Sequence, residues 1–227
     1  MLTDRQKLLL FSVVEDYIKT AEPVSSKSIV DNGIFDISGA TIRNELRSLE
    51  ELGYLTHPHT SAGRIPTEIG YQFYVKNIEI LKELDSQVSE ELEVIFKSKY
   101  DQKQKIKFFA KYLAEVTSAS IIVAFDKNSL YYTGISQLFS QKEFREYEKA
   151  LAISVMFDGC EKCLDDLYKK SEEKEFCLIG ESNPLSKFCS TLIVPFGDAG
   201  LFMLVGPMRM DYGKNIALLE YIKSCNL

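Results

Sequence analysis

The polar segment from Leu55 to Thr67 limits the fold more sharply than any other part of this chain. It reads L-T-H-P-H-T-S-A-G-R-I-P-T and directly follows S-G-A-T-I-R-N-E-L-R-S-L-E-E-L-G, a segment with helical spacing that starts at Ser38 and ends at Gly53. Glycine commonly ends a helix, and a short polar segment with one glycine and one arginine is typical of a hairpin. A short helix followed by such a hairpin predicts a winged helix-turn-helix, and therefore sequence-specific DNA binding.

Two shorter helices are predicted before this one. The first begins with a capping box at Thr3 and ends at Glu22-Pro23, because proline moves the residue before it out of helical geometry. The second is capped by Ser25 or Ser26 and ends at Asn32-Gly33. Three short helices and a hairpin, in this order, are typical of a winged-helix domain.

The helix from Ser38 to Gly53 has an aliphatic side and a polar side. Ile42, Leu46 and Leu49 share one face and are expected to pack inward. The residues that point the other way, or flank that face, are Ala40, Thr41, Arg43, Asn44, Arg47 and Ser48. Arginine suits guanine and asparagine suits adenine in the major groove, so we favour base contact over a merely solvated surface. Glu45 lies off this face and is expected to make a local pair.

The hairpin adds candidate contacts of its own. Gly63 is expected to make the tight turn, and Arg64 to reach a phosphate or the minor groove. His57 and His59 are the only histidines, and no cysteine or third ligand stands nearby, so we expect a structural or phosphate-contacting role rather than a metal site. The full set of predicted DNA-binding residues is Lys27, Thr41, Arg43, Asn44, Arg47, Ser48, His59, Thr60, Ser61 and Arg64.

The charge of the chain excludes a general nucleic-acid coat. The net charge is −6, and the first 76 residues hold eight lysines and arginines against ten aspartates and glutamates. If this chain binds DNA, its positive charge must be concentrated on one face. More of the discrimination is then left to base contacts and to the geometry of a dimer.

The composition also bears on the compartment. No apolar run approaches the roughly 20 residues of a membrane-spanning helix, and the polar start of the chain has no export signal. Five cysteines, an odd number without framework spacing, fit a reducing environment. We therefore expect a cytoplasmic protein with no membrane partner.

The middle of the chain is predicted to be helical. A further helix from Thr67 carries the aromatic residues Tyr71, Phe73 and Tyr74, which are expected to pack on the domain or on a partner. Residues from about Leu81 to Lys111 are charged and have a helical period, so we expect a connecting helix at the domain boundary.

Strand-like segments alternate with helices in the second half. Apolar runs bounded by Gly, Pro, Asn or Asp predict strands at Ile121–Phe125, Phe176–Ile179, Leu192–Phe196 and Leu201–Val205. One or two helices are expected over Lys142–Lys170, and Ile216, Leu219 and Ile222 mark an amphipathic helix near the end. This pattern predicts an α+β second domain.

No catalytic, cofactor or metal site is expected. The sequence has no Ser-His-Asp order, no phosphate-binding glycine loop and no paired-histidine motif. Cys160 and Cys163 form a C-x-x-C pair, but Cys177, Cys189 and Cys225 stand singly, so buried apolar cysteines are favoured over a zinc site. A transcriptional regulator that senses a ligand or a thiol oxidant through its second domain stays open as the alternative function.

Stretches in both halves of the chain resemble the heat-inducible transcription repressor HrcA family. They are L-T-D-R-Q-K at the start, E-P-V-S-S-K (22–27), S-G-A-T-I-R-N-E-L (38–46), L-E-E-L-G-Y-L (49–55), P-H-T-S-A-G-R-I-P-T (58–67), Y-T-G-I-S-Q-L-F-S-Q-K-E-F (132–144), I-G-E-S-N (179–183) and G-P-M-R-M-D-Y (206–212). They follow the family's order over most of the chain, and the hairpin and the G-P-x-R-M-x-Y stretch are the most specific.

The resemblance implies a repressor of chaperone operons that binds an inverted-repeat operator, the CIRCE element, as a homodimer. It implies further that heating removes the activity and that a GroEL-type chaperonin supports the active fold. The family's second domain is similar to a GAF domain. On this basis we divide the chain into a winged-helix DNA-binding domain (1–76), a linker helix region (77–117) and a GAF-like domain (118–227).

The sequence departs from the family pattern in two places. Family members carry an additional dimerising segment inserted in the GAF-like domain, whereas here Asp126 runs almost at once into Tyr131-Tyr132-Thr133-Gly134. A dimer interface is therefore expected in the GAF-like domain, the linker helix, or both. The second departure is Met208, which stands where the family commonly has threonine.

Overall fold

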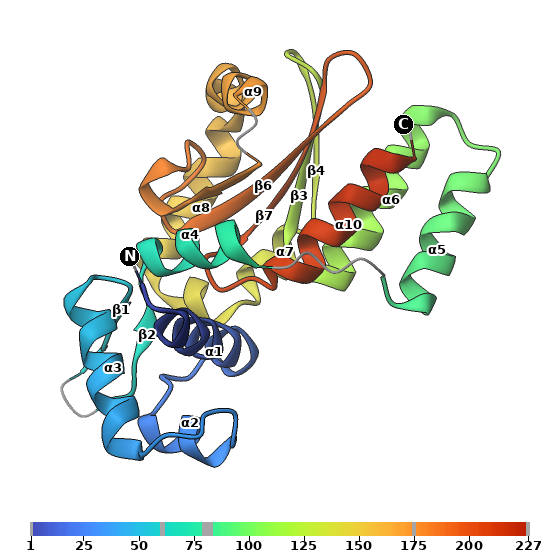
Figure 1. Ribbon diagram of the computed structural model, residues 1–227. Coiled ribbons are helices and arrows are strands. Elements are labelled where there is room, and N and C mark those ends of the chain that lie inside the picture. Colours follow the sequence, from blue (N-terminus) through green and yellow to red (C-terminus); the bar gives the residue numbers. More distant parts are fainter. Residues whose placement is uncertain (1, 60–61, 79–83, 174–175, 226–227) are drawn as a thin grey trace. The chain divides into compact units, whose positions relative to one another are not determined.

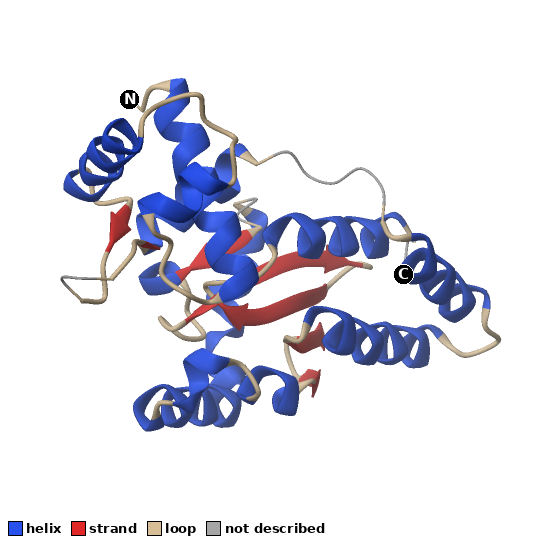
Figure 2. Ribbon diagram, turned by 90° about the horizontal axis from the view of Figure 1, so that it is seen from below, coloured by secondary structure: helices blue, strands red, loops and turns tan. Residues whose placement is uncertain are grey.

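A computed structural model describes residues 2–59, 62–78, 84–173 and 176–225 (Figures 1 and 2). The chain divides into two compact units. The N-terminal unit is Met1–Ile78 and the C-terminal unit is Glu79–Leu227. Within the described residues, no helix has the length and apolar character needed to cross a membrane.

The N-terminal unit consists of helices and one small antiparallel strand pair. Its elements are α1 (Asp4–Thr20), α2 (Ser26–Asp31), α3 (Gly39–Glu51), β1 (Leu55–Thr56), β2 (Ile65–Pro66) and α4 (Glu68–Asn77). Leu55 pairs with Pro66 across the hairpin. The predicted helix starts are confirmed, because Thr3 forms a capping box with Gln6, Ser25 caps α2 and Ser38 caps α3.

The core of the N-terminal unit is mainly aliphatic, with aromatic rings packed between α1 and α4. Its fully covered side chains include Leu9, Leu10, Val13, Val14, Ile29, Ile42, Leu46 and Leu49. Phe11 of α1 packs edge-to-face on Tyr74 of α4, with ring centroids 5.1 Å apart. The aromatic residues of α4 were expected to pack on the domain or on a partner, and the burial of Tyr71 and Tyr74 with the contact to Phe11 favours the domain.

The C-terminal unit is an α+β fold with one five-stranded sheet. Its strands are β3 (Ser120–Asp126), β4 (Ser129–Thr133), β5 (Cys177–Ile179), β6 (Cys189–Phe196) and β7 (Gly200–Pro207), in the order β4-β3-β7-β6-β5. All four neighbouring pairs are antiparallel. The helices are α5 (Ser86–Lys97), α6 (Gln102–Thr117), α7 (Ile135–Phe139), α8 (Tyr147–Gly159), α9 (Leu164–Glu172) and α10 (Tyr212–Ser224). The predicted α+β class is confirmed, and the arrangement is consistent with a GAF-like domain.

Helices cover both faces of this sheet (Figure 1). One face packs under α7, α8 and α9, with Ile122, Met203 and Ile193 from three adjacent strands in the same apolar cluster as Ile153 and Leu167. The other face lies under α6 and α10. Because both faces are covered, β6 and β7 are apolar along most of their length rather than alternating.

Two stretches that carry the family resemblance meet in space. Arg209 donates to Glu143 Oε1 at 2.5 Å and to Gln141 Oε1 at 3.2 Å, and this joins the 206–212 stretch to the 132–144 stretch. Tyr212 is fully buried, and its hydroxyl donates to the carbonyl of Met208 at 2.7 Å and accepts from Ser190 at 2.7 Å. These contacts join the 206–212 stretch to the 132–144 stretch and to β6.

The structure differs from the sequence-based elements in two places. The helix expected over about 81–111 is divided into α5 and α6, because Asp101 caps a new helix by accepting from the Gln104 amide at 2.8 Å. The strand β4 and the helix α7 were not predicted. Strand β4 is a short edge strand whose side chains are mostly half-buried, so it lacks a clear apolar pattern.

Candidate nucleic-acid interface

Helix α3 has an exposed polar side opposite its buried aliphatic side. Ser38 and the buried Ile42, Leu46 and Leu49 fix its start and its inward face, as predicted. Arg43, Asn44 and Arg47 are exposed. Arg47 pairs with Glu51 at 3.0 Å, and both side chains are mostly in water, so this pair holds the arginine only weakly.

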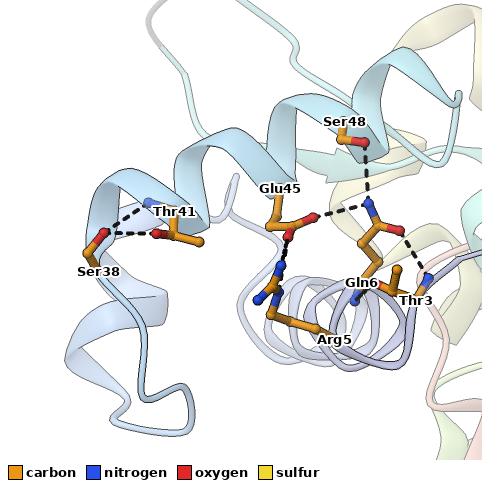
Figure 3. Close-up of polar contacts among 7 residues, drawn as sticks. All are labelled: Thr3, Arg5, Gln6, Ser38, Thr41, Glu45 and Ser48. Carbon is orange, nitrogen blue, oxygen red and sulfur yellow. Dashed lines mark hydrogen bonds and ion pairs between the residues drawn. The ribbon is translucent and has the colours of Figure 1, made fainter.

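The adjacent face of α3 is turned toward α1 (Figure 3). Ser48 accepts a hydrogen bond from Gln6 Nε2 at 3.3 Å, and Glu45 accepts from the same group at 3.0 Å and from Arg5 Nε at 3.0 Å. The placement of Ser48 on the outward face was therefore wrong. The expectation of a local partner for Glu45 was also wrong, because its partners stand about forty positions away in the sequence. Both contacts depend on how α1 crosses α3.

Thr41 belongs to the start of α3. Its amide donates to Ser38 Oγ at 3.2 Å, and its own hydroxyl lies 3.0 Å from the same atom (Figure 3). The side chain is half-buried. Thr41 therefore already takes part in the cap of the helix that carries Arg43 and Asn44.

The remaining predicted contacts are spread over α2 and the hairpin. Lys27 on α2 is exposed, and so is His59 between β1 and β2. Thr60 and Ser61 lie outside the described residues. Ala62 donates its amide to the carbonyl of His59 at 2.9 Å.

Arg64 lies at the base of the hairpin. Its Nη2 donates to Glu50 Oε2 at 3.0 Å, and only 25% of its side chain is exposed. The other oxygen of Glu50 makes a short contact with His57 Nδ1. Sequence reasoning missed Glu50, since a glutamate at a helix end gives no sign that the chain will bring an arginine and a histidine back to it.

The two histidines show no metal-binding arrangement. His57 faces Glu50, whereas His59 is exposed. Across the part of the chain that the structure describes, no three His, Cys, Asp or Glu side chains come together as a metal site.

Burial disfavours the thiolate form of the cysteines. Burial raises the pKa of the Cys160 and Cys163 thiols, and it raises those of Cys177 and Cys189 to about 12. A thiol reacts with oxidants as the thiolate, which a raised pKa disfavours. Cys160 and Cys163 also pack in the apolar cluster under the sheet, so these two side chains fit a packing role better than a sensing role.

Among the described residues, the surface hollows of the C-terminal unit include the following two. One, of about 290 Å³, lies at the end of the β6–β7 hairpin and includes Lys103, Phe125 and Asp198. The other, of about 420 Å³, is lined by Phe176, Val194, Glu220 and neighbouring residues. Each hollow is lined by a mixture of apolar and charged side chains.

Comparison with known proteins agrees with this architecture. The family model of the HrcA protein C-terminal domain matches residues 75–216. This range runs from the end of α4 into α10 and includes the whole five-stranded sheet.

Several curated relatives carry the same name, heat-inducible transcription repressor HrcA. The protein of Caldanaerobacter subterraneus subsp. tengcongensis is 45% identical over 128 residues, which cover 56% of this chain and 36% of that protein. The protein of Brevibacillus brevis is 42% identical over 124 residues, which cover 54% and 36%. That of Thermoanaerobacter pseudethanolicus is 56% identical over 77 residues, which cover 34% and 22%. The matched part of the chain thus spans at most about a third of the length of these relatives.

The fold is also found among solved structures. One of them is described as a hypothetical protein at 2.2 Å resolution, and it matches with a TM-score of 0.71 and 18% identity over 99% of this chain and 96% of that one. At this identity the likeness shows the fold alone.

Proposed function

The chain belongs to the heat-inducible transcription repressor HrcA family, and from this premise we propose that it represses heat-shock operons by binding operator DNA. The α2–α3 pair and the β1–β2 hairpin would act as a winged helix-turn-helix. The repressor would work in the cytoplasm, as a homodimer on an inverted-repeat operator of the CIRCE type. Its activity would fall on heating and be supported by a GroEL-type chaperonin.

The observation that carries this proposal is the division of charge on α3. Glu45 and Glu50 face cations of the N-terminal unit itself, whereas Arg43, Asn44 and Arg47 are exposed. An acidic protein thereby presents two arginines and an asparagine on the exposed side of one short helix, beside the carboxylate of Glu51. Such a surface fits the major groove, where arginine and asparagine can each bond a base edge with two hydrogen bonds.

Arg47→Ala tests the proposed base contact. On an inverted-repeat operator duplex at fixed salt, we expect the substitution to cost about 1–3 kcal/mol of specific binding free energy, since one bidentate contact is lost. A gel shift measures the affinity and shows whether two chains bind per duplex. Lys99→Ala is the matched control, because it removes one exposed positive charge from the C-terminal unit.

Two results would contradict the proposal. One is folded wild-type protein that binds the operator no better than an unrelated duplex, with or without a GroEL-type chaperonin. The other is an equal effect of Arg47→Ala and Lys99→Ala, which would mean that α3 reads no base.

A further inference from the structure

The two legs of the β1–β2 hairpin share one carboxylate. Glu50 stands in the last turn of α3, His57 follows β1 and Arg64 directly precedes β2. Glu50 Oε1 contacts His57 Nδ1, and Glu50 Oε2 accepts from Arg64 Nη2 at 3.0 Å. These three residues are called the Glu50 cluster below. It connects both legs of the hairpin to the end of α3.

The second leg is also fixed through its backbone. Arg64 and Val24 exchange two hydrogen bonds of 2.8 Å, amide to carbonyl in both directions. Val24 lies just before α2, so the leg is held between the start of α2 and the end of α3. The backbone bridge to Val24 thus fixes the position of the Arg64 main chain, and the ion pair with Glu50 fixes the position of its guanidinium group.

The ion pair of Arg64 differs in kind from that of Arg47. The Arg64 side chain is 25% exposed and that of Glu50 is 23% exposed, against 76% and 65% for Arg47 and Glu51. Arg64 Nε is also buried without a hydrogen-bond partner among the described residues. A partly buried guanidinium depends on its counter-charge far more than one in water does, so Arg64 leaves Glu50 less readily than Arg47 leaves Glu51.

We propose that Arg64 is a positioning residue, which acts through Glu50 to set the hairpin against α3 and does not itself bind a DNA phosphate. The inference rests on the proposed DNA-binding function. Under this proposal, the exposed side chains of α3 and of the hairpin contact the DNA directly. The Glu50 cluster sets the distance between α3 and the hairpin.

The salt dependence of DNA binding separates positioning from phosphate contact. A lost phosphate contact lowers the slope of log K against log salt by roughly 0.9. We expect an unchanged slope for Arg64→Gln, with a loss of specific affinity on the order of tenfold. Glu50→Gln should give a similar loss, and the double variant no more than either single one, because both remove the same contact. Arg64→Lys should restore part of the affinity, since an ammonium can still pair with Glu50.

Amide hydrogen exchange gives a second measurement that needs no DNA. In Glu50→Gln and Arg64→Gln the amides of Val24 and Arg64 should exchange faster than in the wild type, because the leg is released. Glu51→Gln is the matched control, since that carboxylate pairs only at the surface and should leave both amides unchanged. Circular dichroism verifies that each variant is folded.

The inference is overturned if Arg64→Gln lowers the salt slope by about one while Glu50→Gln keeps or raises the affinity. Arg64 would then bind a phosphate, and Glu50 would compete for it. Unchanged exchange of the Val24 and Arg64 amides in both variants would overturn it as well. If the wild-type protein does not distinguish operator from unrelated DNA, the proposed function is contradicted instead. The hydrogen-exchange measurement still tests the positioning role of Arg64 in that case.

Discussion

Gly63 is needed for a reason other than the one its sequence context suggests. Gly63 is not among the glycines with a positive φ, so a left-handed turn conformation does not explain it. Instead, a Cβ at this position would lie 2.5 Å from the backbone carbonyl of Val24. The glycine therefore permits the close approach of two chain segments that are far apart in sequence.

Gly63→Ala should destabilise the protein by roughly 1–3 kcal/mol, because the new methyl group forces apart the Arg64–Val24 bridge. Urea unfolding monitored by circular dichroism measures the change. Gly39→Ala is the control, since its Cβ would meet only Val30 Cγ2 at 3.5 Å. Equal stability of Gly63→Ala and wild type would show that the hairpin leg can move away at no cost.

At the scale of single elements, α3 shows which features a sequence can and cannot give. Local chemistry and the 3.6-residue period predicted its cap at Ser38 and its end before Gly53. They also predicted its buried face, which consists of Ile42, Leu46 and Leu49. The contacts of Ser48 with Gln6 and of Arg64 with Glu50 were not. They depend on how distant segments meet, and no local pattern encodes that.

The same reasoning covers the C-terminal unit. The strands β3, β6 and β7 were predicted because they are long and apolar, whereas β4 was not, since it lies at the sheet edge with mostly half-buried side chains. The break between α5 and α6 was missed because the charged segment keeps a helical period across it, and Asp101 caps a new helix there.

Ser38→Ala should shorten or loosen the start of α3. The substitution removes the acceptor for the Thr41 amide, and such a lost cap costs about 1 kcal/mol. Ser38→Asp keeps an acceptor and should retain the stability. Denaturant unfolding of the three proteins makes the comparison, and an equal loss in both variants would mean that the serine contributes by packing rather than by capping.

On the scale of the whole molecule, the chain consists of two units with separate cores. Units with their own cores commonly unfold in separate steps. The smaller, N-terminal unit is then expected to lose its fold first on heating, because a smaller domain buries a smaller share of its surface.

Scanning calorimetry should therefore show two transitions. Operator duplex at a hundred times its Kd should stabilise only the transition of the N-terminal unit, by roughly 2.7 kcal/mol. An unrelated duplex of equal length is the control. A single transition that shifts as a whole would show that the two units unfold together.

The turn between β3 and β4 has a consequence for protein engineering. It consists of the exposed Lys127 and Asn128, and the Asn128 amide donates to Asp126 Oδ1 at 2.7 Å. The chain leaves and re-enters the sheet here at adjacent points, at the rim of an edge strand. Foreign sequence is best accepted at exposed turns whose ends are close together. A fluorescent protein or an obligate coiled-coil pair could be inserted into this turn, and the sheet would then display the inserted domain.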